Sequence, residues 1–330
     1  MTSVFISILN WNDAASTIQC VHSVRQSAVS SDVAITLVVL DNGSNLADWA
    51  ALQHGLAGGD VVLIRQETNT GFAAGHNVVI RQAIERKADY IWLLNNDAIV
   101  KPDTLAGLLK TISEFPACGV VSPLIYAHYD EKIMDFVGAI QDWSKLDSRR
   151  AGDPVAAKNM QASHQSDFFV YGTAPLFNTT ALSAAGLLEE KLFAYYEDEE
   201  MCARLACIGW SSNMAFSVTV QHFQRKSSFD ERPPYYFYLM ARNSLFFYLR
   251  HTPRSFRRWI RLRLFSRAMI KSAQLRERGL SEKSNACLLG IWDGLRGRGG
   301  PPQLDDTPPA WLIFISKVFP YRLQQWLDAT

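Results

Sequence analysis

The sequence predicts an α/β fold with a mostly parallel central sheet and flanking helices, followed by a helical C-terminal extension. Two observations predict the sheet. Four short segments have the continuous apolar character of strands that are covered on both faces: residues 4–9, 33–40, 61–64 and 90–94. A helical pattern follows each of them, and four strand–helix units in about 100 residues favour right-handed crossovers between parallel strands. A third observation, helical periodicity at residues 235–250, 254–278 and 281–297, predicts the extension.

Turn and capping residues delimit these elements. Asp13 is an N-cap for a helix that runs to about residue 27, and residues 46–56 form a helix that ends at Gly55 or Gly58. Residues 69–72 break the pattern before a helix through Ile84. Asn and Asp residues follow each predicted strand. Parallel strands bring these clusters to one edge of the sheet.

The middle of the chain is less regular. Residues 118–123 and 133–137 have strand character, and the polar residues 145–165 read as a mobile loop. Strand character returns at residues 167–178 around Gly172, where a ligand or another backbone segment can approach closely. Thr179 or Thr180 then caps a short helix that ends near Gly186.

Composition excludes several classes of protein. The 330 residues are 48% hydrophobic and 20% charged, as in ordinary globular proteins rather than disordered ones. The five cysteines form no CxxC pair, so we expect reduced thiols in a cytoplasmic protein and no structural zinc. We expect neither a signal peptide nor a membrane span, since no apolar run approaches about 20 residues.

The net charge of +1 conceals an uneven distribution. Residues 1–224 hold 14 Lys and Arg against 24 Asp and Glu, whereas residues 225–300 hold 17 against 5. Arginines interleaved with apolar residues near 254–267 suit the surface of an anionic membrane, and the alternative is a helix whose charged side is merely solvated. No nucleic-acid motif accompanies them, so we expect no nucleic-acid partner. The apolar residues 311–319 leave contact with the membrane or a homodimer open.

The segment YIWLLNNDAIV at residues 90–100 is the first candidate for chemistry. A buried strand leads directly into Asn95, Asn96 and Asp97 at the ligand-binding edge. A carboxylate there can hold a divalent cation, which in turn can hold a diphosphate. The alternative is a turn in which these side chains bond their own backbone. Neither GxGxxG nor GxxxxGK[ST] is present, so dinucleotide-binding and P-loop sites lack their defining loops.

The segment LFAYYEDEEMCARLACIGW at residues 192–210 is the second candidate. It places four carboxylates at the start of a helix that ends at Gly209, with Met201, Leu205 and Ile208 on its core face. Helix capping alone is one explanation, because carboxylates at a helix N-terminus are stabilised by the dipole. Four acids after three aromatic residues exceed that need, and partial burial would raise a carboxylate pKa towards that of a useful general base.

His222 follows a strand-like segment, residues 216–221. At the end of a strand it is a candidate metal ligand, and the alternative is an ordinary polar histidine. Residues 225–228, RKSS, are suited either to phosphate contacts or to a solvated loop.

These segments, in this order and at this spacing, resemble family 2 glycosyltransferases of the GT-A (Rossmann-like) fold, especially their bacterial rhamnosyltransferase-like branch. The resemblance covers roughly residues 3–250. The matching segments are ISILNWN (6–12), VVLDNGS (38–44), NTGFAAGHN (69–77), LLNNDA (93–98), YYEDEEMCARLACIGW (195–210), QHF (221–223) and YLMARNSLFFYLR (238–250).

The resemblance implies an inverting sugar transfer from a nucleotide-diphospho donor with Mg²⁺ or Mn²⁺. Asn95–Asp97 occupies the place of the family's DxD motif, with Asn95 in place of the first Asp. The residues assigned to the donor are Asn10, Asn12, Asp41, Asn69, Gly71, Asn77, Asn95 and Asn96. Those assigned to the metal are Asp97 and His222. Asp198 matches the family's general base, with Glu197 beside it, and the residues assigned to the acceptor are Glu200, Gly172 and Thr173.

We therefore expect a catalytic domain at residues 1–232, with a nucleotide-binding half (1–100) and an acceptor half (101–232), before a basic helical region at 233–330. The expected enzyme transfers rhamnose or a related sugar from dTDP or UDP to a polysaccharide or lipid-linked acceptor, as in O-antigen synthesis. It would be cytoplasmic or peripheral on the inner face of the cytoplasmic membrane. The alternatives are a sugar-phosphate nucleotidyltransferase and an inactive nucleotide-sugar- or carbohydrate-binding subunit.

Overall fold

Two compact units make up the protein in the computed structural model, which describes residues 1–128, 130–223 and 231–328. The N-terminal unit comprises Met1–Asp142, Ser148–Glu190 and Glu197–Arg225, and the C-terminal unit comprises Trp143–Asp147, Lys191–Tyr196 and Lys226–Thr330. The division differs from a single expected boundary at residue 232. Two short segments that precede that boundary cluster with the C-terminal helices instead of with the sheet.

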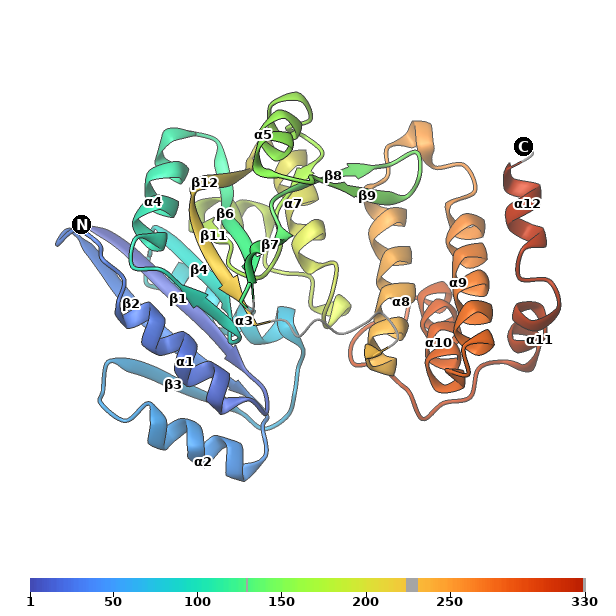
Figure 1. The fold of residues 1–330 in the computed structure, drawn as a ribbon, viewed down its shortest axis with the longest axis horizontal. Coiled ribbons are helices and arrows are strands. Elements are labelled where there is room, and N and C mark those ends of the chain that lie inside the picture. Colours follow the sequence, from blue (N-terminus) through green and yellow to red (C-terminus); the bar gives the residue numbers. More distant parts are fainter. Residues whose placement is uncertain (129, 224–230, 329–330) are drawn as a thin grey trace. The chain divides into compact units, whose positions relative to one another are not determined.

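A mixed sheet forms the centre of the N-terminal unit (Figure 1). In the described residues its strand order is β3-β2-β1-β4-β11-β6-β12-β5, with β7 paired to β6. Strands β3, β2, β1 and β4 are parallel, β11 is antiparallel to both of its neighbours, and β12 is parallel to β6 but antiparallel to β5. The strand bounds are β1 Thr2–Asn10, β2 Val33–Asn42, β3 Val61–Gln66, β4 Tyr90–Asn95, β5 Ala98–Val100, β6 Cys118–Ala127, β7 Asp130–Phe136, β11 Leu176–Asn178 and β12 Ser211–His222.

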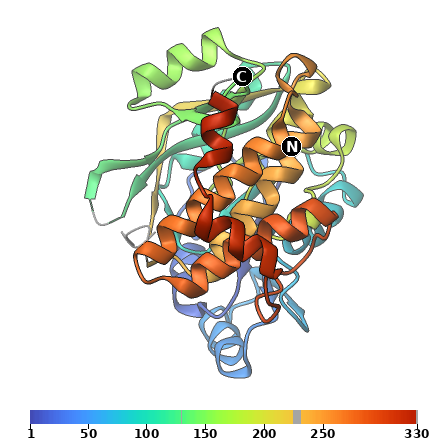
Figure 2. The same ribbon diagram turned by 90° about the vertical axis from the view of Figure 1, so that its right-hand side faces the viewer.

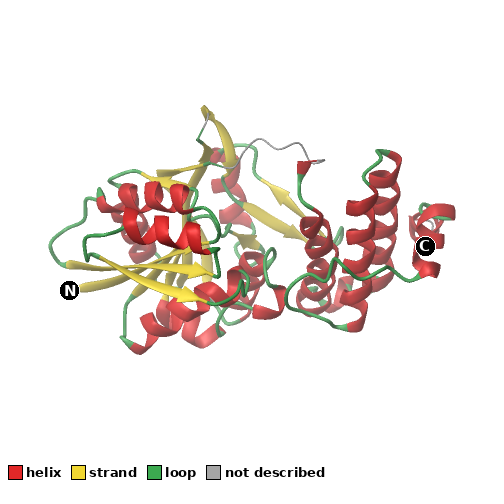
Figure 3. Ribbon diagram, turned by 90° about the horizontal axis from the view of Figure 1, so that it is seen from below, coloured by secondary structure: helices red, strands yellow, loops and turns green. Residues whose placement is uncertain are grey.

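Helices lie on both faces of this sheet (Figure 3). Helices α1 and α2 contact each other, and α3 packs on β1, β2 and β4. The strand order runs outward from β1 to β3 and then returns to β4 on the other side of β1. Right-handed crossovers therefore put α1 and α2 on one face of the sheet and α3 on the other. The mostly parallel α/β architecture predicted from the sequence is therefore confirmed for the first four strands. The helix bounds are α1 Ala14–Arg25, α2 Leu46–Gly55, α3 Phe72–Glu85, α4 Thr104–Glu114, α6 Thr179–Ala185 and α7 Glu197–Cys207.

Three local predictions were wrong. The expected loop at residues 145–165 contains β9 (Asp147–Arg150) and α5 (Pro154–Ser163), and β9 joins β8 (Ala139–Asp142) and β10 (Phe168–Phe169) in a small sheet. Asn178, not a threonine, caps α6, because its side chain accepts from the backbone N–H groups of Thr180 and Ala181. Ile208 lies beyond the end of α7 and is 48% exposed, so it is not part of the core.

The C-terminal unit is helical, and its helices lie side by side (Figure 2). Its helix bounds are α8 Pro234–His251, η3 Arg254–Phe256, α9 Ile260–Glu277, α10 Ser281–Arg296, α11 Ala310–Val318 and α12 Arg322–Asp328. Helix α9 starts later than expected, because Trp259 adopts a left-handed conformation before it. Helices α8 and α10 approach so closely that a Cβ atom at Gly290 would lie 2.1 Å from the carbonyl oxygen of Tyr238. None of the helices in the described part of the chain has both the length and the apolarity to cross a membrane.

A buried Arg–Asn pair on α8 holds the segment that precedes α7. The Asn243 Nδ2 atom lies 2.8–2.9 Å from three carbonyl oxygens of that segment, those of Leu192, Ala194 and Tyr195, so its two N–H groups are shared among them. Arg242 is fully buried and donates to the carbonyls of Leu192 and Gly300. These contacts lie within the C-terminal unit, and through them α8 fixes a segment that is mostly outside regular secondary structure.

The buried His76 on α3 makes the fold sensitive to acid. Its Nδ1 atom hydrogen-bonds Ser7 Oγ at 2.8 Å, and its Nε2 atom finds no hydrogen-bond partner among the described residues. Burial lowers the pKa of His76 to about 3. The unfolded chain takes up this proton near pH 6.5, so stability should fall by up to about 1.4 kcal/mol per pH unit between about pH 6.5 and 3.

We expect His76→Gln, which cannot be protonated, to reduce this loss. Urea unfolding of both proteins at pH 7 and pH 5 measures it: the drop in unfolding free energy should be smaller for the variant. Equal drops would show that His76 does not carry the effect.

Candidate active site

The ends of β1, β2 and β4 bring three predicted site residues to one edge of the sheet. Asn10 pairs with Asp41 in the β1–β2 register, and Asn95 lies opposite the residue before Asn10. The Asn10 side chain donates to Asp41 Oδ1 at 2.8 Å and also to Ser44 and Asp48. Asn10 is fully buried with its amide engaged, so it orients the loop around Asp41 instead of facing open solvent.

Asp41 is a fully buried carboxylate with several donors around it. In addition to Asn10, the Ser44 N–H group donates to Asp41 Oδ2 at 3.3 Å, and Arg65 Nε lies 3.6 Å from the same oxygen. A buried charge is tolerated only when it is paired and hydrogen-bonded, and Asp41 meets both conditions. The arrangement fixes the position of the carboxylate at the strand end.

The loops after β1 and β2 are tied to each other through Asn12. Asn12 has a positive φ of 54° and its Oδ1 atom accepts from the Asn45 backbone N–H group at 2.9 Å. Its own N–H group donates to Ser44 Oγ at 2.8 Å. The structure thus brings Asn12 to the same edge as Asn10 and Asp41, in a loop where Asn12 is exposed.

Asn69 and Gly71 join this edge through a residue that sequence reasoning missed. Asn42 Nδ2 donates to Asn69 Oδ1 and to the Gly71 carbonyl, both at 3.1 Å. Asn69 Oδ1 also accepts from the Gly71 N–H group, and Gly71, with φ 91°, precedes the first turn of α3. The position of Asn42 directly after Asp41 in a strand-end cluster was the available signal.

Two predicted site residues lie in other surroundings. Asn77 is fully buried and its amide bonds the backbone of Leu188 and the carboxylate of Glu190, so it joins the core beside α3. Glu200 is 2% exposed and forms a two-point ion pair with Arg204, which in turn donates to the Ala185 and Leu187 carbonyls. The structure therefore gives both residues structural contacts and does not bring them to the strand edge.

At the end of β4, Asp97 faces a histidine held by a second carboxylate. His222 Nε2 lies 3.2 Å from Asp97 Oδ1, and His222 Nδ1 lies 2.8 Å from Asp135 Oδ2. The pairing of β12 with β5 sets His222 opposite Ala98, one residue after Asp97. Asn96 turns the other way and donates to Thr17 Oγ1 on α1 at 3.1 Å. Asp135, on β7, was missed because its sequence neighbourhood carries no motif.

The charges on this array determine the protonation of His222. Burial acts to lower the pKa of His222, but the carboxylates of Asp135 and Asp97 outweigh it and raise the pKa to about 9. The array therefore carries a positive imidazolium between two carboxylates at neutral pH. No group of three or more His, Cys, Asp or Glu residues converges as a complete metal site in the part of the chain that is described.

Asp198 lies in the first turn of α7 and is linked to the end of β4 by backbone hydrogen bonds. The Gly172 N–H group donates to Asp198 Oδ2 at 2.9 Å, and the next residue, Thr173, accepts from the Asn95 N–H group through its carbonyl at 2.9 Å. Because these two links are adjacent in the chain, the structure brings Asp198, Gly172 and Thr173 to the same edge as Asn95 and Asp97.

Burial perturbs the pKa values of two carboxylates at the start of α7, those of Glu197 and Asp198. It raises the pKa of Asp198, although the N–H groups of Gly172 and Glu199 oppose the shift. Burial and the charge of Asp198 hold the pKa of Glu197 well above its usual range. Glu197 Oε2 is buried and finds no hydrogen-bond partner among the described residues. Two backbone N–H groups, those of Gly172 and Glu199, thus stabilise the ionised form of Asp198, which is the form that a general base requires. Residues 225–228, the RKSS segment suited to phosphate contacts, lie outside the described residues.

Comparison with known proteins identifies the domain. Residues 3–166 match the family model of glycosyl transferase family 2. Residues 3–166 are thus similar to a family 2 glycosyltransferase domain. No curated protein matches the sequence significantly.

Solved structures of glycosyltransferases share the fold of this chain. Mannosyltransferase PcManGT from Pyrobaculum calidifontis, in complex with GDP-Man and Mn²⁺, is similar with a TM-score of 0.57 and 14% identity, over 89% of this chain and 87% of that one. GalNAc-T7 with UDP, GalNAc and Mn²⁺ is similar with a TM-score of 0.52 and 18% identity, over 73% of this chain and 48% of that one. The predicted GT-A fold is confirmed, whereas the rhamnosyltransferase-like branch remains a prediction.

The turn that carries Asp41 in the glycosyltransferase domain depends on Gly43. Gly43 has φ 76°, and a Cβ atom there would lie 2.4 Å from the backbone carbon of Thr68. We expect Gly43→Ala to lower the unfolding free energy by at least about 3 kcal/mol, from a left-handed alanine plus a backbone clash.

Gly59→Ala is the matched control, because Gly59 has φ 81° but no atom within 4 Å of the added Cβ. It should lose only the conformational part, about 1–2 kcal/mol. Urea unfolding measures both values, and equal losses would contradict a role for the Thr68 contact.

Proposed function

We propose that this protein is an inverting, metal-dependent glycosyltransferase that uses Asp198 as its general base. The donor would be a dTDP- or UDP-linked sugar, with rhamnose favoured, and the acceptor a polysaccharide or lipid-linked glycan of the bacterial cell surface. The observation that carries the proposal is the shared edge of the sheet, where Asp97 with its His222–Asp135 array and Asp198 are linked through Thr173 and Gly172. The family 2 domain supplies independent support.

The residues at the end of β4 fit a Mg²⁺ or Mn²⁺ ion. Asp97 offers a carboxylate oxygen, and His222 would offer an imidazole nitrogen 3.2 Å away once a cation displaces the proton that the two carboxylates otherwise hold on its ring. Asp135 orients the imidazole from its other nitrogen, as outer-sphere carboxylates do in metal sites. Two protein ligands suffice when substrate phosphates and water supply the others. A cation bound there would neutralise charge on the diphosphate leaving group. Asp41 and Asn12 lie at the neighbouring strand ends, where a nucleoside would extend from that diphosphate.

The acceptor side of the reaction rests on Asp198. In a direct displacement, the acceptor oxygen bonds to the anomeric carbon as the bond from that carbon to the diphosphate breaks, which inverts the configuration. Asp198 would take the proton of the attacking hydroxyl. Its raised pKa suits this role, since a base is most effective when its pKa lies nearer the working pH. Glu197, whose pKa burial and the charge of Asp198 hold well above its usual range, would orient the acceptor.

Basic helices in the C-terminal unit support attachment to an anionic membrane surface. Helix α9 carries five Lys and Arg against one Glu, and the unit exposes large apolar side chains: Phe256, Trp259, Trp311, Phe314, Val318, Phe319, Tyr321 and Trp326. Aromatic and basic side chains together suit the interface of a bilayer. A lipid-linked acceptor would give such attachment a purpose.

Replacing the base tests the mechanism. We expect Asp198→Asn to lower kcat by about 10²–10⁴-fold while donor binding is retained, because general-base catalysis contributes that much. Steady-state kinetics and calorimetric titration of the donor measure the two quantities. Glu199→Gln removes a charge from the same helical turn and should keep most activity. The wild-type kcat/KM should rise with pH through an inflection above about 3.9, the ordinary Asp pKa, because the base acts when ionised. Equal activity of Asp198→Asn and wild type would exclude Asp198 as the base.

Replacing the metal ligand tests the donor side. We expect Asp97→Asn to weaken Mn²⁺-dependent binding of a nucleoside diphosphate by at least about ten-fold, as loss of a charge-assisted contact implies. Calorimetry with and without Mn²⁺ provides the measurement, and Asp103→Asn, at an exposed position after β5, is the matched control. A Mn²⁺ enhancement that is the same in Asp97→Asn and wild type would contradict the assignment. Donor hydrolysis by the purified protein would separate an active transferase from an inactive binding subunit.

A further inference from the structure

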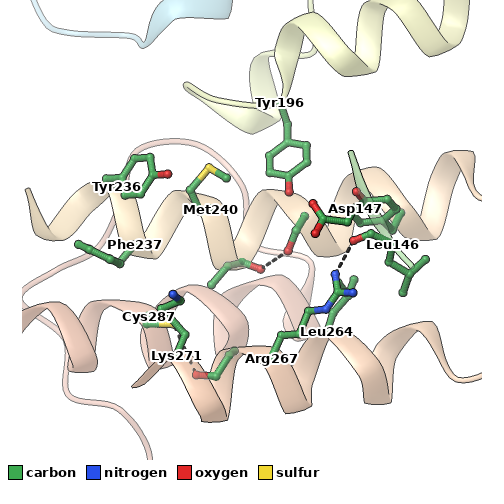
Figure 4. A pocket seen from close by; sticks show the side chains of 14 residues that line it. Leu146, Asp147, Tyr196, Tyr236, Phe237, Met240, Leu264, Arg267, Lys271 and Cys287 are labelled. Carbon is green, nitrogen blue, oxygen red and sulfur yellow. Dashed lines mark hydrogen bonds between the residues drawn. The ribbon is translucent and has the colours of Figure 1, made fainter. Parts of the chain in front are cut away.

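The C-terminal unit contains a cavity that is separate from the residues assigned to the donor. Its volume is about 230 Å³, and all of its lining residues belong to that unit. Aromatic and aliphatic side chains form most of its wall, including Tyr236, Phe237, Met240 and Leu264, and three charged residues, Asp147, Arg267 and Lys271, complete it (Figure 4). A mostly apolar wall with a few polar groups is the usual composition of a ligand pocket.

The charged residues of the cavity favour an anionic ligand. Arg267 and Lys271, one helical turn apart on α9, bring two positive charges against the single carboxylate of Asp147. Arg267 also donates to the carbonyls of Lys145 and Leu146, and so fixes the segment that presents Asp147. The excess of positive charge on α9 extends this preference beyond the cavity itself.

Tyr196 connects the cavity with the proposed base through the chain. It lines the cavity, where Figure 4 shows its hydroxyl end pointing to Asp147, and it precedes Asp198 by two residues. Phe193, Tyr195 and Tyr196 have φ values of 67°, 67° and 74°, which are outliers for bulky residues. Such strain persists only where the surroundings impose it, and Asn243 imposes it through its carbonyl contacts. The strained segment thus ends with Tyr196, a wall residue of the cavity, which directly precedes α7 in the chain.

The volume indicates that only part of a ligand enters. It lies below the range of about 300–1,000 Å³ that encloses a whole drug-sized ligand. A chain segment of a longer amphiphile satisfies the apolar wall, the positive charge and the limited volume together. We propose that this cavity binds the lipid portion of a lipid-linked acceptor, with the apolar chain among Phe237, Met240 and Leu264 and its phosphate near Lys271. This assignment rests on the proposed glycosyltransferase function.

Binding of decyl phosphate to the intact protein tests the cavity. Calorimetry, below the micellar concentration, should show saturable binding that is stronger than that of decanol or inorganic phosphate. Lys271→Gln should weaken it by about ten-fold through loss of a charge-assisted contact, whereas Arg261→Gln, an exposed position on the same helix, should not. Ala241→Phe should abolish it by filling the cavity, with the melting temperature and nucleotide binding retained as checks on folding.

Several outcomes would overturn the proposal. Unchanged binding in Ala241→Phe would place the ligand elsewhere, and equal binding of decanol or of inorganic phosphate would remove the need for an amphiphilic anion. Equal affinity for dihexanoylphosphatidylglycerol would assign the cavity to a membrane lipid. The transferase function is judged separately by donor turnover: turnover without decyl phosphate binding refutes the cavity assignment alone, and cavity binding without turnover refutes the function alone.

Discussion

The parallel register of β1, β2 and β4 is the constraint on which the site depends. It places Asn10 beside Asp41 and sets Asn95 next to them, so polar side chains from three distant segments end at one edge. Burying them would be costly without partners, and the Asn10 amide and the Arg65 guanidinium supply partners for the Asp41 carboxylate. The edge is therefore a prearranged polar layer, which reduces the reorganisation that a charged ligand would otherwise demand on binding.

The antiparallel strands then bring the second half of the chain to the same edge. Strand β11 inserts between β4 and β6, and the segment before it carries Gly172 and Thr173 past the end of β4. Strand β12 runs antiparallel to β5, which sets His222 opposite the residue after Asp97. A purely parallel continuation would have required further crossover helices at this point. The mixed topology is thus what allows Asp97 and His222 to meet, and it brings Gly172, which donates to Asp198, to the end of β4.

Sequence reasoning recovered the elements with strong local signals and missed the features that depend on tertiary contacts. The strands and helices of the first 100 residues follow from continuous apolar runs and Asn/Asp turns, and Asp13 caps α1 as predicted. The prediction that every strand is covered on both faces was wrong for β3, which lies at the edge of the sheet and is only partly buried. Asp135 carries no local signal, because only the β6–β7 pairing brings it to His222. Asn77 and Glu200 lie on motif segments, but helix geometry turns both side chains towards the core. A linear motif identifies a segment and leaves the direction of each side chain to the packing.

In the segment before α7, hydrogen bonds from the buried Arg242 and Asn243 offset the strain of the backbone. Three aromatic residues with positive φ cost of order 1–3 kcal/mol each, so an unsupported chain would relax. Arg242 and Asn243 oppose that relaxation by donating to the carbonyls of Leu192, Ala194 and Tyr195. Carbonyl oxygens surround the buried Arg242 guanidinium. It also lies over the ring of Tyr238, whose hydroxyl group donates to Asp293. Apolar replacements would remove these hydrogen bonds. The Arg–Asn pair is therefore best explained as the support of a strained segment that leads directly into the carboxylates of α7.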